Sequence, residues 1–375
     1  KFRTNGTKPA PPDRFAWMYE VEWGVVILDE FHRMGLNNPE TLAFQSFKKL
    51  KADKRIALSG TPMGGQPIKL WPVLHFLYPD QFSSKWAYAA NWLTIYEDAN
   101  GYKSIGDVKA DKRDDFTRMM AEYSTRRIKT EIMTWLPPKQ YVDVYVELTP
   151  KQKKQYDEWE AEGEIEIDEE GLSAVSVLAL YTRMRQFAGA VQRVESGDMG
   201  EIKLYPTEDS CKLPQVMELL GERGIGEKDA GPVVDPVIIF SQFTRMINMI
   251  EGYLNKKGIK TVKITGQVKA DDRTAAIKAF QDGEVDVFLM NTNAGGVAIT
   301  LDRADTVIFL DETWNPDDQT QAEDRAHRGS KDRQVTVYRL ISKGTIEEQI
   351  YKGNVTKESI NQRVLNNRKM LEEDG

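Results

Sequence analysis

The sequence predicts an α/β protein in which helices cover both faces of a parallel sheet. In the second half, short apolar runs such as residues 237–240 alternate with stretches whose apolar residues recur every three or four positions, such as residues 246–254. The runs are apolar throughout, which is typical of strands buried on both faces. Strands that alternate with helices in this way predict a doubly wound parallel sheet.

The other elements of the second half continue this alternation. We expect further strands at 262–264, 285–290, 307–310 and 335–340, and further helices at 270–280 and 316–328, the last with a proline in its first turn. Upstream of them, residues 221–236 hold four glycines and two prolines. This segment is therefore the best candidate for a flexible link between two lobes.

The first half contains only part of a similar lobe. Residues 25–28 and 55–58 are apolar strand candidates, each followed at once by polar residues or glycine. After Pro62 the pattern becomes helical and rich in aromatic residues, and residues 141–148 form a late strand candidate with alternating apolar and polar positions. The acidic run 158–170 indicates a solvated helix end or loop.

Composition narrows the class of protein. The 375 residues are 40% hydrophobic and 29% charged, which is ordinary for a globular protein and excludes a disordered or collagen-like chain. The single cysteine, Cys211, excludes a disulfide framework and a cysteine-rich zinc module, and it suits a reducing compartment. No apolar stretch approaches the roughly 18 residues that a membrane span needs, so we expect an intracellular protein with no membrane partner.

Charge alone weakly disfavours a nucleic-acid partner. The formal net charge is −7, whereas a protein that coats nucleic acid without specificity is usually basic. An acidic protein can still bind a nucleic-acid backbone in one cleft, because screening confines each charged patch to about a Debye length. The first residue is Lys1, not methionine, so we expect a piece of a longer protein.

Two adjacent acids directly follow the first apolar strand. Asp29 and Glu30 stand at the carboxyl end of residues 25–28, where open α/β sheets place their ligands. Such a pair can divide two tasks, since one carboxylate can hold the Mg²⁺ of a nucleotide while the other orients the attacking water. Acids that complement a helix dipole are an equally weighted interpretation of the dipeptide. His32 follows closely.

Glycine turns follow two other strands. Ser59, Gly60 and Thr61 precede Pro62 directly after residues 55–58, and Gly295-Gly296 comes after residues 285–290. A backbone that approaches a phosphate closely fits these positions. A plain tight turn is the favoured interpretation of either motif by itself.

The predicted helix 316–328 carries a possible anion site. Gln321, Arg325 and Arg328 are spaced i, i+4 and i+7 and would project from one helical face. Guanidinium groups suit phosphate oxygens. Pairing with Glu323 or Asp324 on neighbouring faces is the alternative.

The order of these motifs resembles the helicase superfamily that couples two RecA-like lobes to ATP, and most closely its Swi/Snf branch. The resemblance covers about residues 17–365. It rests on the Asp29-Glu30-Phe31-His32 box, the Ser59-Gly60-Thr61 turn, Arg126-Arg127-Ile128-Lys129, Leu136-Pro137-Pro138-Lys139, Phe240-Ser241-Gln242-Phe243, Ala294-Gly295-Gly296, Trp314-Asn315-Pro316, Asp324-Arg325-Ala326-His327-Arg328 and Gly344-Thr345-Ile346-Glu347-Glu348.

The resemblance implies a domain order. It predicts the C-terminal part of a first RecA-like lobe, a second complete lobe, helical insertions between them and a helical tail. The expected boundaries are 1–62 for the first lobe, 63–140 for a helical insertion, 141–149 for a strand that returns to the first lobe, 150–220 for a second insertion and the start of the second lobe, 221–236 for the linker, 237–345 for the second lobe and 346–375 for the tail.

The resemblance also implies ATP and Mg²⁺ as cofactors. Asp29 would hold Mg²⁺ through its water shell, and Glu30 would polarise the attacking water. Arg325 and Arg328 would be arginine fingers that stabilise charge on the transferring phosphoryl group. The residues that would sense the nucleotide and pass its state between the lobes are His32, Ser59, Gly60, Thr61 and Gln321.

The implied partner is double-stranded DNA, with RNA less favoured. Most contacts would go to the backbone and carry no sequence information. The residues along this track would be Ser241, Gln242, Thr265, Gly266, Asn291 and Thr292. Trp314 would approach the duplex, although a core anchor is an equally good interpretation of a lone tryptophan.

One departure from the family pattern limits the expected activity. The sequence contains no G-x-x-x-x-G-K-[ST], the P-loop that cradles nucleotide phosphates, which should precede Asp29. We therefore expect an ATP-dependent translocase on duplex DNA whose P-loop lies in a segment or subunit N-terminal to this chain, and no useful hydrolysis by these residues alone. A non-catalytic nucleic-acid-binding or split-subunit module is the alternative; a strand-separating helicase is less favoured.

Overall fold

The computed structural model divides the chain after Thr125 into two compact units, each described here by itself. The residues that the structure describes are 16–32, 41–60, 62–63, 66–97, 101, 103–170, 174–196, 202–226, 235–292 and 299–355. Within these residues, no helix has the length and apolar character that crossing a membrane requires.

A pair of parallel strands forms the start of the first unit. A short 3₁₀ helix, η1 (Ala16–Tyr19), precedes β1 (Glu22–Leu28), and β1 pairs with β2 (Lys51–Ala57) from Glu22 opposite Lys51 to Leu28 opposite Ala57. Between the strands lies α1 (Leu42–Phe47), which begins where the Thr41 hydroxyl accepts a hydrogen bond from the Phe44 amide at 3.2 Å. Both strands predicted for this half are therefore present.

Only one face of this pair is covered in the described residues. Leu28 and Ala57 pack against α1 and α2 (Trp71–Leu77). On the other side, Val25 and Ile27 are 48% and 58% exposed, and Ile56 is 44% exposed. In the described residues β1 is therefore buried on one face only, because side chains alternate between the faces and helices cover a single face.

The rest of the first unit is helical and aromatic, as predicted. It contains the 3₁₀ helices η2 (Pro67–Leu70) and η3 (Ala110–Lys112), the helices α3 (Lys85–Trp92) and α4 (Arg113–Tyr123), and a hairpin of β3 (Leu93–Glu97) and β4 (Lys103–Val108). The sequence analysis did not predict the hairpin. A core of aromatic and aliphatic side chains that includes Tyr88, Leu93 and Phe116 joins these elements.

The described residues of the second unit form a six-stranded parallel sheet. Its order is β5-β12-β11-β8-β10-β9. The strands are β5 (Gln140–Val146), β8 (Val237–Ser241), β9 (Thr261–Ile264), β10 (Val287–Asn291), β11 (Thr306–Phe309) and β12 (Thr336–Ser342). All residues of β8, β10 and β11 are buried, which confirms the α/β class predicted from continuous apolar runs.

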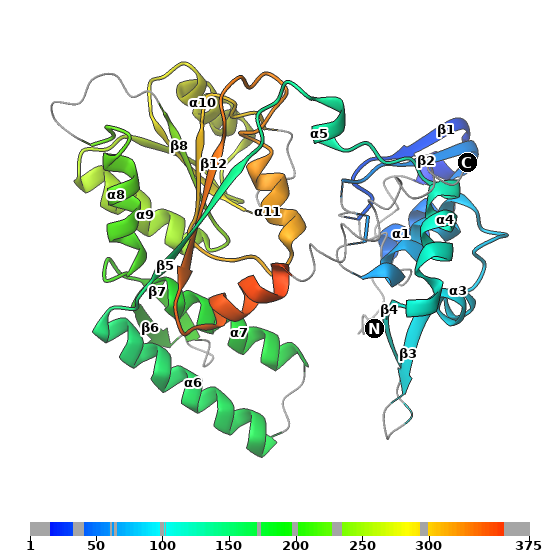
Figure 1. Ribbon diagram of the computed structural model, residues 1–375, viewed down its shortest axis with the longest axis horizontal. Coiled ribbons are helices and arrows are strands. Elements are labelled where there is room, and N and C mark those ends of the chain that lie inside the picture. Colours follow the sequence, from blue (N-terminus) through cyan, green and yellow to red (C-terminus); the bar gives the residue numbers. More distant parts are fainter. Residues whose placement is uncertain are drawn as a thin grey trace. The chain divides into compact units, whose positions relative to one another are not determined.

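Helices cover both faces of this sheet (Figure 1). On one face α8 (Lys212–Gly221) and α9 (Thr244–Lys256) pack against Val237, Ile239 and Leu289. On the other face α10 (Ala270–Gln281) and α11 (Pro316–Glu323) pack against Ile238, Phe240 and their neighbours. Side chains of β8 thus alternate between two apolar cores, as a strand with helices on both faces requires.

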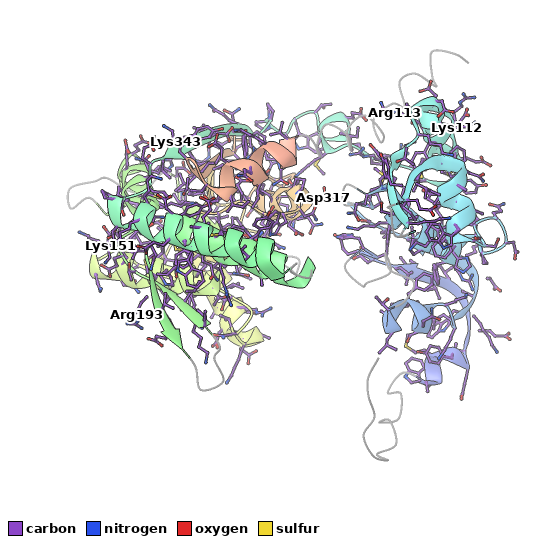
Figure 2. All side chains as sticks on the ribbon, turned by 90° about the horizontal axis from the view of Figure 1, so that it is seen from below. Lys112, Arg113, Lys151, Arg193, Asp317 and Lys343 are labelled. Carbon is purple, nitrogen blue, oxygen red and sulfur yellow. The ribbon has the colours of Figure 1, made fainter. Side chains whose placement is uncertain are left out.

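Further helices complete the unit beside the sheet. They are the short α5 (Lys129–Ile132), α6 (Pro150–Glu170), which contains the acidic run, α7 (Ala174–Gly189), and helical turns over residues 346–355. A hairpin of β6 (Gln192–Ser196) and β7 (Ile202–Pro206) follows α7. At the start of α6, Lys151 is exposed whereas the next residue, Gln152, is fully buried (Figure 2).

Two predicted boundaries are wrong. Residues 141–149 do not return to the first lobe, because β5 pairs along its whole length with β12 and belongs to the second unit. Residues 221–236 do not link the units either. Ile225 is buried in the second unit, and Arg223 Nε donates to Asp235 Oδ2 at 3.2 Å, so the described ends of this segment pack within one core. Residues 227–234 lie outside the described residues.

Candidate functional site

The acidic pair of the first unit stands in a tight turn at the carboxyl end of β1. Glu30 has a φ of 48°, in the left-handed region that few residues other than glycine adopt. Backbone hydrogen bonds from the Leu58 amide to the Leu28 carbonyl (2.8 Å) and from the Phe31 amide to the Leu58 carbonyl (3.3 Å) hold the turn against the end of β2. Asp29 is exposed and Glu30 half-buried. Strain of this kind concentrates at functional sites.

Side chains from the ends of β1 and β2 meet at this turn. His32 Nδ1 lies 2.8 Å from the Ser59 hydroxyl and 3.4 Å from Glu30 Oε2. The structure therefore brings together His32, Ser59 and Glu30, three of the residues that the sequence analysis singled out. Gly60 follows with open space around its α-carbon, so a side chain there would meet no neighbour. Thr61 lies outside the described residues.

The residues proposed for the DNA track lie at the carboxyl edge of the second sheet, but most of them are buried. Ser241, Thr265, Asn291 and Thr292 are at most 8% exposed. The Asn291 amide donates to the carbonyls of Ser241 and Gln242 at 3.0 and 2.8 Å. The Asn291 side chain therefore joins the end of β10 to the loop after β8. Gln242 is half-buried and Gly266 is exposed. The Gly295-Gly296 turn lies outside the described residues.

Asp311, which the sequence analysis missed, organises this edge. Its carboxylate accepts hydrogen bonds from the Ser241 hydroxyl and from the Gln242 amide, the latter at 2.9 Å. It directly follows the apolar run 307–310, with one residue between it and the last residue of β11, so its position after an apolar run was the available signal. A buried carboxylate that accepts from two neighbouring groups fixes the loop after β8.

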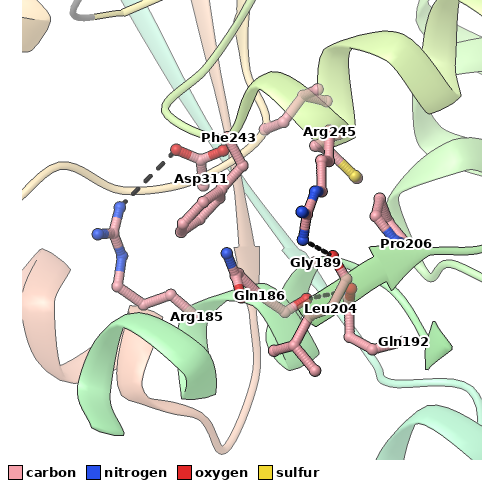
Figure 3. Close-up of a pocket in the computed structure, with 11 residues that line it drawn as sticks. Arg185, Gln186, Gly189, Gln192, Leu204, Pro206, Phe243, Arg245 and Asp311 are labelled. Atoms are coloured by element: carbon pink, nitrogen blue, oxygen red, sulfur yellow. Dashed lines mark hydrogen bonds and ion pairs between the residues drawn. The ribbon is translucent and has the colours of Figure 1, made fainter. Parts of the chain in front are cut away.

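Arg185 of α7 is a second residue of this edge that was not predicted from the sequence. Its guanidinium group faces Asp311 across 3.8 Å (Figure 3). It donates to Gln242 Oε1 at 2.7 Å and to the carbonyl of Glu312, although only 2% of Arg185 is exposed. Arg185 therefore joins the loop after β8 to the loop after β11.

Aromatic rings complete the environment of Arg185. The guanidinium carbon lies 5.1 Å from the ring centroid of Phe243 and 5.6 Å from that of Trp314. Trp314 is half-buried, and its ring lies 6.1 Å from that of Tyr181 in α7. Trp314 is thus packed against α7, as the core-anchor interpretation describes.

A small cavity adjoins this cluster between α7, β7 and α9 (Figure 3). Its volume is about 20 Å³, enough for one water molecule. Arg185 and Asp311 line one side and Arg245 another, and Arg245 Nη1 donates to the Leu204 carbonyl at 2.6 Å. The cavity is too small for a nucleotide or a base, so it fits a structural water only.

The predicted arginine helix is shorter than expected. The helix α11 ends at Glu323, and residues 324–326 form a turn. The argument that Gln321, Arg325 and Arg328 project from one helical face is therefore wrong. Arg325 is 6% exposed and Arg328 is half-buried, with its Nη2 atom 3.4 Å from the Ile299 carbonyl. Both arginines still lie in the short segment 324–328 that follows the helix.

Comparison with known families identifies two domains in sequence order. Residues 13–192 match the SNF2-related domain, and residues 219–330 match the helicase conserved C-terminal domain. Together these matches include the acidic pair, the Ser59 turn, the loops after β8 to β11 and the arginine turn.

Several curated proteins are similar to most of this chain. The chain is 30% identical over 339 residues to the human "SWI/SNF-related matrix-associated actin-dependent regulator of chromatin subfamily A member 1", covering 88% of this chain and 31% of that protein. It is 28% identical over 365 residues to a rice "probable chromatin-remodeling complex ATPase chain", covering 96% and 31%. It is 30% identical over 343 residues to the zebrafish "chromodomain-helicase-DNA-binding protein 1-like", covering 90% and 31%. The chain spans about a third of these relatives.

Two solved structures are also similar. The "Sulfolobus solfataricus SWI2/SNF2 ATPase core in complex with dsDNA" is 27% identical, with a TM-score of 0.48, and the match covers 92% of this chain and 69% of that one. The "C-terminal part of Fun30 ATPase domain" is 23% identical, with a TM-score of 0.49, and the match covers 63% and 99%.

Proposed function

Because this chain belongs to the SNF2-related family, we propose that it is part of an ATP-dependent motor that moves along double-stranded DNA. The observation that carries the proposal is the contact of His32 with both Glu30 and Ser59 at the ends of two parallel strands. A carboxylate held in a strained turn and linked to a neighbouring strand through a histidine is suited to orient a water molecule and to report the state of the site.

Asp29 and Glu30 divide the chemistry at this edge. In this proposal the exposed carboxylate of Asp29 holds a hydrated Mg²⁺ ion and the half-buried Glu30 orients the attacking water. In the described residues no group of three or more His, Cys, Asp or Glu side chains could form a protein cage for a metal ion. This donor set fits Mg²⁺, which usually binds one or two carboxylates together with nucleotide phosphates and water. When bound, Mg²⁺ neutralises charge on those phosphates.

Arg325 and Arg328 supply positive charge from the second unit. Both are held in one turn, and Arg325 is buried among its neighbours. A guanidinium group kept in place before the reaction stabilises charge that develops on a phosphoryl group without reorganisation. His32 and Ser59 in the first unit and Gln321 in the second are proposed to couple the nucleotide to the movement of the units.

We propose that hydrolysis requires a P-loop outside these residues. The sequence has no G-x-x-x-x-G-K-[ST]. The outer face of the β1–β2 pair supports this proposal, since Val25, Ile27, Ile56 and Leu58 are 44–58% exposed there. Apolar side chains that are this exposed among the described residues favour a further layer of structure against them.

DNA contact is assigned to the carboxyl edge of the second sheet. Gly266 and the half-buried Gln242 are accessible at this edge, whereas Ser241, Asn291, Thr292 and Asp311 bond to one another's loops. In this proposal the buried residues set the backbone geometry and the exposed ones contact phosphates, which carry no sequence information.

Steady-state ATP hydrolysis with and without duplex DNA tests the function. We would compare this chain, the full reading frame that encodes it, and that frame with Glu30→Gln. The proposed motor is supported if the full frame hydrolyses ATP, if duplex DNA stimulates this hydrolysis, and if Glu30→Gln abolishes it. Activity of equal size in this chain alone would contradict the need for a separate P-loop. No activity in any of the three would favour the non-catalytic nucleic-acid-binding or split-subunit module.

A further inference from the structure

A segment from the start of the second unit lies against the turn that carries both arginines. We call residues 128–139 the strap and residues 323–329 the arginine turn. The strap includes α5, follows the first residues of the second unit and leads directly into β5. All contacts described below lie within this one unit.

Lys139 binds the residues that precede Arg325. Its ammonium group donates to Glu323 Oε2 at 2.7 Å and to Asp324 Oδ1 at 3.2 Å. Tyr141, two residues further along, donates its hydroxyl to the same Glu323 oxygen at 2.9 Å. The Glu323 side chain is only 2% exposed and that of Lys139 13%. Burial disfavours the charge on Lys139, but Glu323 and Asp324 outweigh this effect and raise its pKa.

Two other residues of the strap, Lys129 and Trp135, bond to the arginine turn on both sides of Arg325. Lys129 donates to Asp324 Oδ1 at 3.1 Å and to the His327 carbonyl. Trp135 Nε1 donates to the Gly329 carbonyl at 3.0 Å. The strap therefore contacts the arginine turn before Arg325, between Arg325 and Arg328, and after Arg328.

His327 makes a further hydrogen bond, in which the arginine turn supplies the donor and the strap supplies the acceptor. Its Nε2 atom lies 2.8 Å from the Pro137 carbonyl, which can only accept, so Nε2 carries the proton. Burial lowers the pKa of His327, and the ring is therefore neutral near pH 7. A neutral ring with its proton on Nε2 makes this bond without adding a charge next to Arg328.

We propose that Lys139 is a positioning residue for Arg325 and Arg328. The helix α11 ends at Glu323, and beyond it the amides of Arg325 and Ala326 still donate to the carbonyls of Ala322 and Glu323 at 3.2 and 3.0 Å, which holds the backbone of the turn. The strap adds a side-chain anchor through Lys139 to these backbone bonds, so a shift of the arginine turn would break a buried ion pair. The inference rests on the proposed function of the two arginines, since a positioning role has meaning only if they act on the nucleotide.

The first test is kinetic and uses the full reading frame. Lys139→Met removes the ammonium group and keeps most of the side-chain volume. We expect kcat for DNA-stimulated ATP hydrolysis to fall about 10- to 100-fold, as small misplacements of acting groups do, with KM for ATP changed less than about 3-fold. Lys139→Arg should recover more than half of the lost activity.

A second variant separates positioning from folding. In Lys139→Met the Glu323 carboxylate loses its partner while buried, and the protein is destabilised for that reason alone. The double variant Lys139→Met with Glu323→Gln removes this unpaired charge and should recover the melting temperature but not kcat. If kcat recovers together with the melting temperature, Lys139 is merely structural and the proposal is overturned.

Lys343→Met is the matched control. Lys343 also pairs with a carboxylate, Glu147 at 2.8 Å, but it lies at the surface of the same unit with 48% of its side chain exposed (Figure 2). A surface pair contributes little to stability, and this variant should keep wild-type kcat. An equal loss of kcat in Lys343→Met would overturn a specific role for Lys139.

Amide hydrogen exchange provides a readout that needs no catalysis. In the folded double variant, amides of residues 324–328 should exchange at least about 10-fold faster than in the wild type, while those of β10 stay unchanged. Unchanged exchange in the arginine turn would overturn the proposal even if the motor is inactive. The proposed function would be refuted if the wild-type full frame showed no DNA-stimulated ATP hydrolysis. It would also be refuted if Arg325→Ala and Arg328→Ala left that hydrolysis unchanged. In either case the exchange rates of residues 324–328 still test the contact between Lys139 and the arginine turn.

Discussion

The ammonium group of Lys212 lies 2.8 and 2.6 Å from the two carboxylate oxygens of Glu347, and both side chains are completely buried. Lys212 also donates to the carbonyls of Leu310 and Leu340, the latter at 3.1 Å, and Glu347 accepts from the Ser342 amide at 3.1 Å. This ion pair joins the start of α8 to the ends of two central strands and to the helical turns after Gly344.

Removal of one partner of this pair should strongly destabilise the protein. We expect Lys212→Met to lower the free energy of unfolding by about 3–5 kcal/mol, because Glu347 would remain buried without a counter-charge. Lys212→Met combined with Glu347→Gln should be clearly more stable than the single variant. Denaturant midpoints of the three proteins measure this, and a single variant as stable as the wild type would contradict the structure.

Glu312 should make stability depend on pH. Burial raises its pKa to about 7, opposed by Arg339 and Lys212 and reinforced by Glu347 and Asp311. The folded state therefore holds this proton more tightly than the unfolded state, and the free energy of unfolding falls as pH rises from about 4.5 to about 7.

Glu312→Gln should remove this dependence, a change on the order of 2–3 kcal/mol across the window, and stabilise the protein at pH 8. Denaturant midpoints at several pH values from 5 to 8 test it, with Glu147→Gln at an exposed position as the control. Parallel pH profiles of Glu312→Gln and the wild type would show that another group is responsible.

Arg185→Met should weaken DNA binding without changing its salt dependence. Arg185 is buried and holds Gln242 and the Glu312 carbonyl, so it acts on the loops and not on phosphates. We expect an affinity loss of about 10-fold and an unchanged slope of log affinity against log salt, since no phosphate contact is lost. Filter or anisotropy titrations at several salt concentrations measure both values.

Arg183→Met is the control for Arg185, because Arg183 lies on the same helix with its guanidinium over Trp159 at 6.0 Å. Its affinity for DNA should match that of the wild type. A reduced salt slope in Arg185→Met would instead mean that Arg185 itself contacts a phosphate.

Cys211 should report the opening of the second unit. It is the one cysteine of the chain, it is 7% exposed, and burial raises the pKa of its thiol. A maleimide reagent should therefore label the native protein at least about 100-fold more slowly than the denatured protein. Rapid labelling under native conditions would show that α8 opens locally.

The strands were predictable because their signal is local. The run Val237 to Phe240 is apolar at every position, and β8 lies at the centre of the sheet with both faces covered. The partner of a strand is not local information. The alternating pattern of residues 141–148 predicted a strand correctly, but its pairing with β12 depends on residues far along the chain.

The candidate site shows the same division. Asp29 and Glu30 were found because they follow an apolar run, and the contact of His32 with Ser59 follows from parallel strands whose ends meet at one edge. The end of α11 at Glu323 was not predicted, since no glycine or proline stands there. At this helix end Lys139 bonds to Glu323 and Lys129 bonds to Asp324, and both lysines are distant in the sequence. No local sequence pattern encodes such contacts.

The position of β5 shows that the boundary between the two family matches differs from the boundary between the two folded units. The SNF2-related match extends to residue 192, yet residues from Arg126 onward share a core and a sheet with the helicase C-terminal match. A fragment cut between the two matches would leave β12 with an open edge and take Lys139 away from Glu323. Dissection of this protein into independently folding halves should therefore follow the boundary at Thr125, and genetic exchanges between relatives should preserve residues 126–146 together with the C-terminal half.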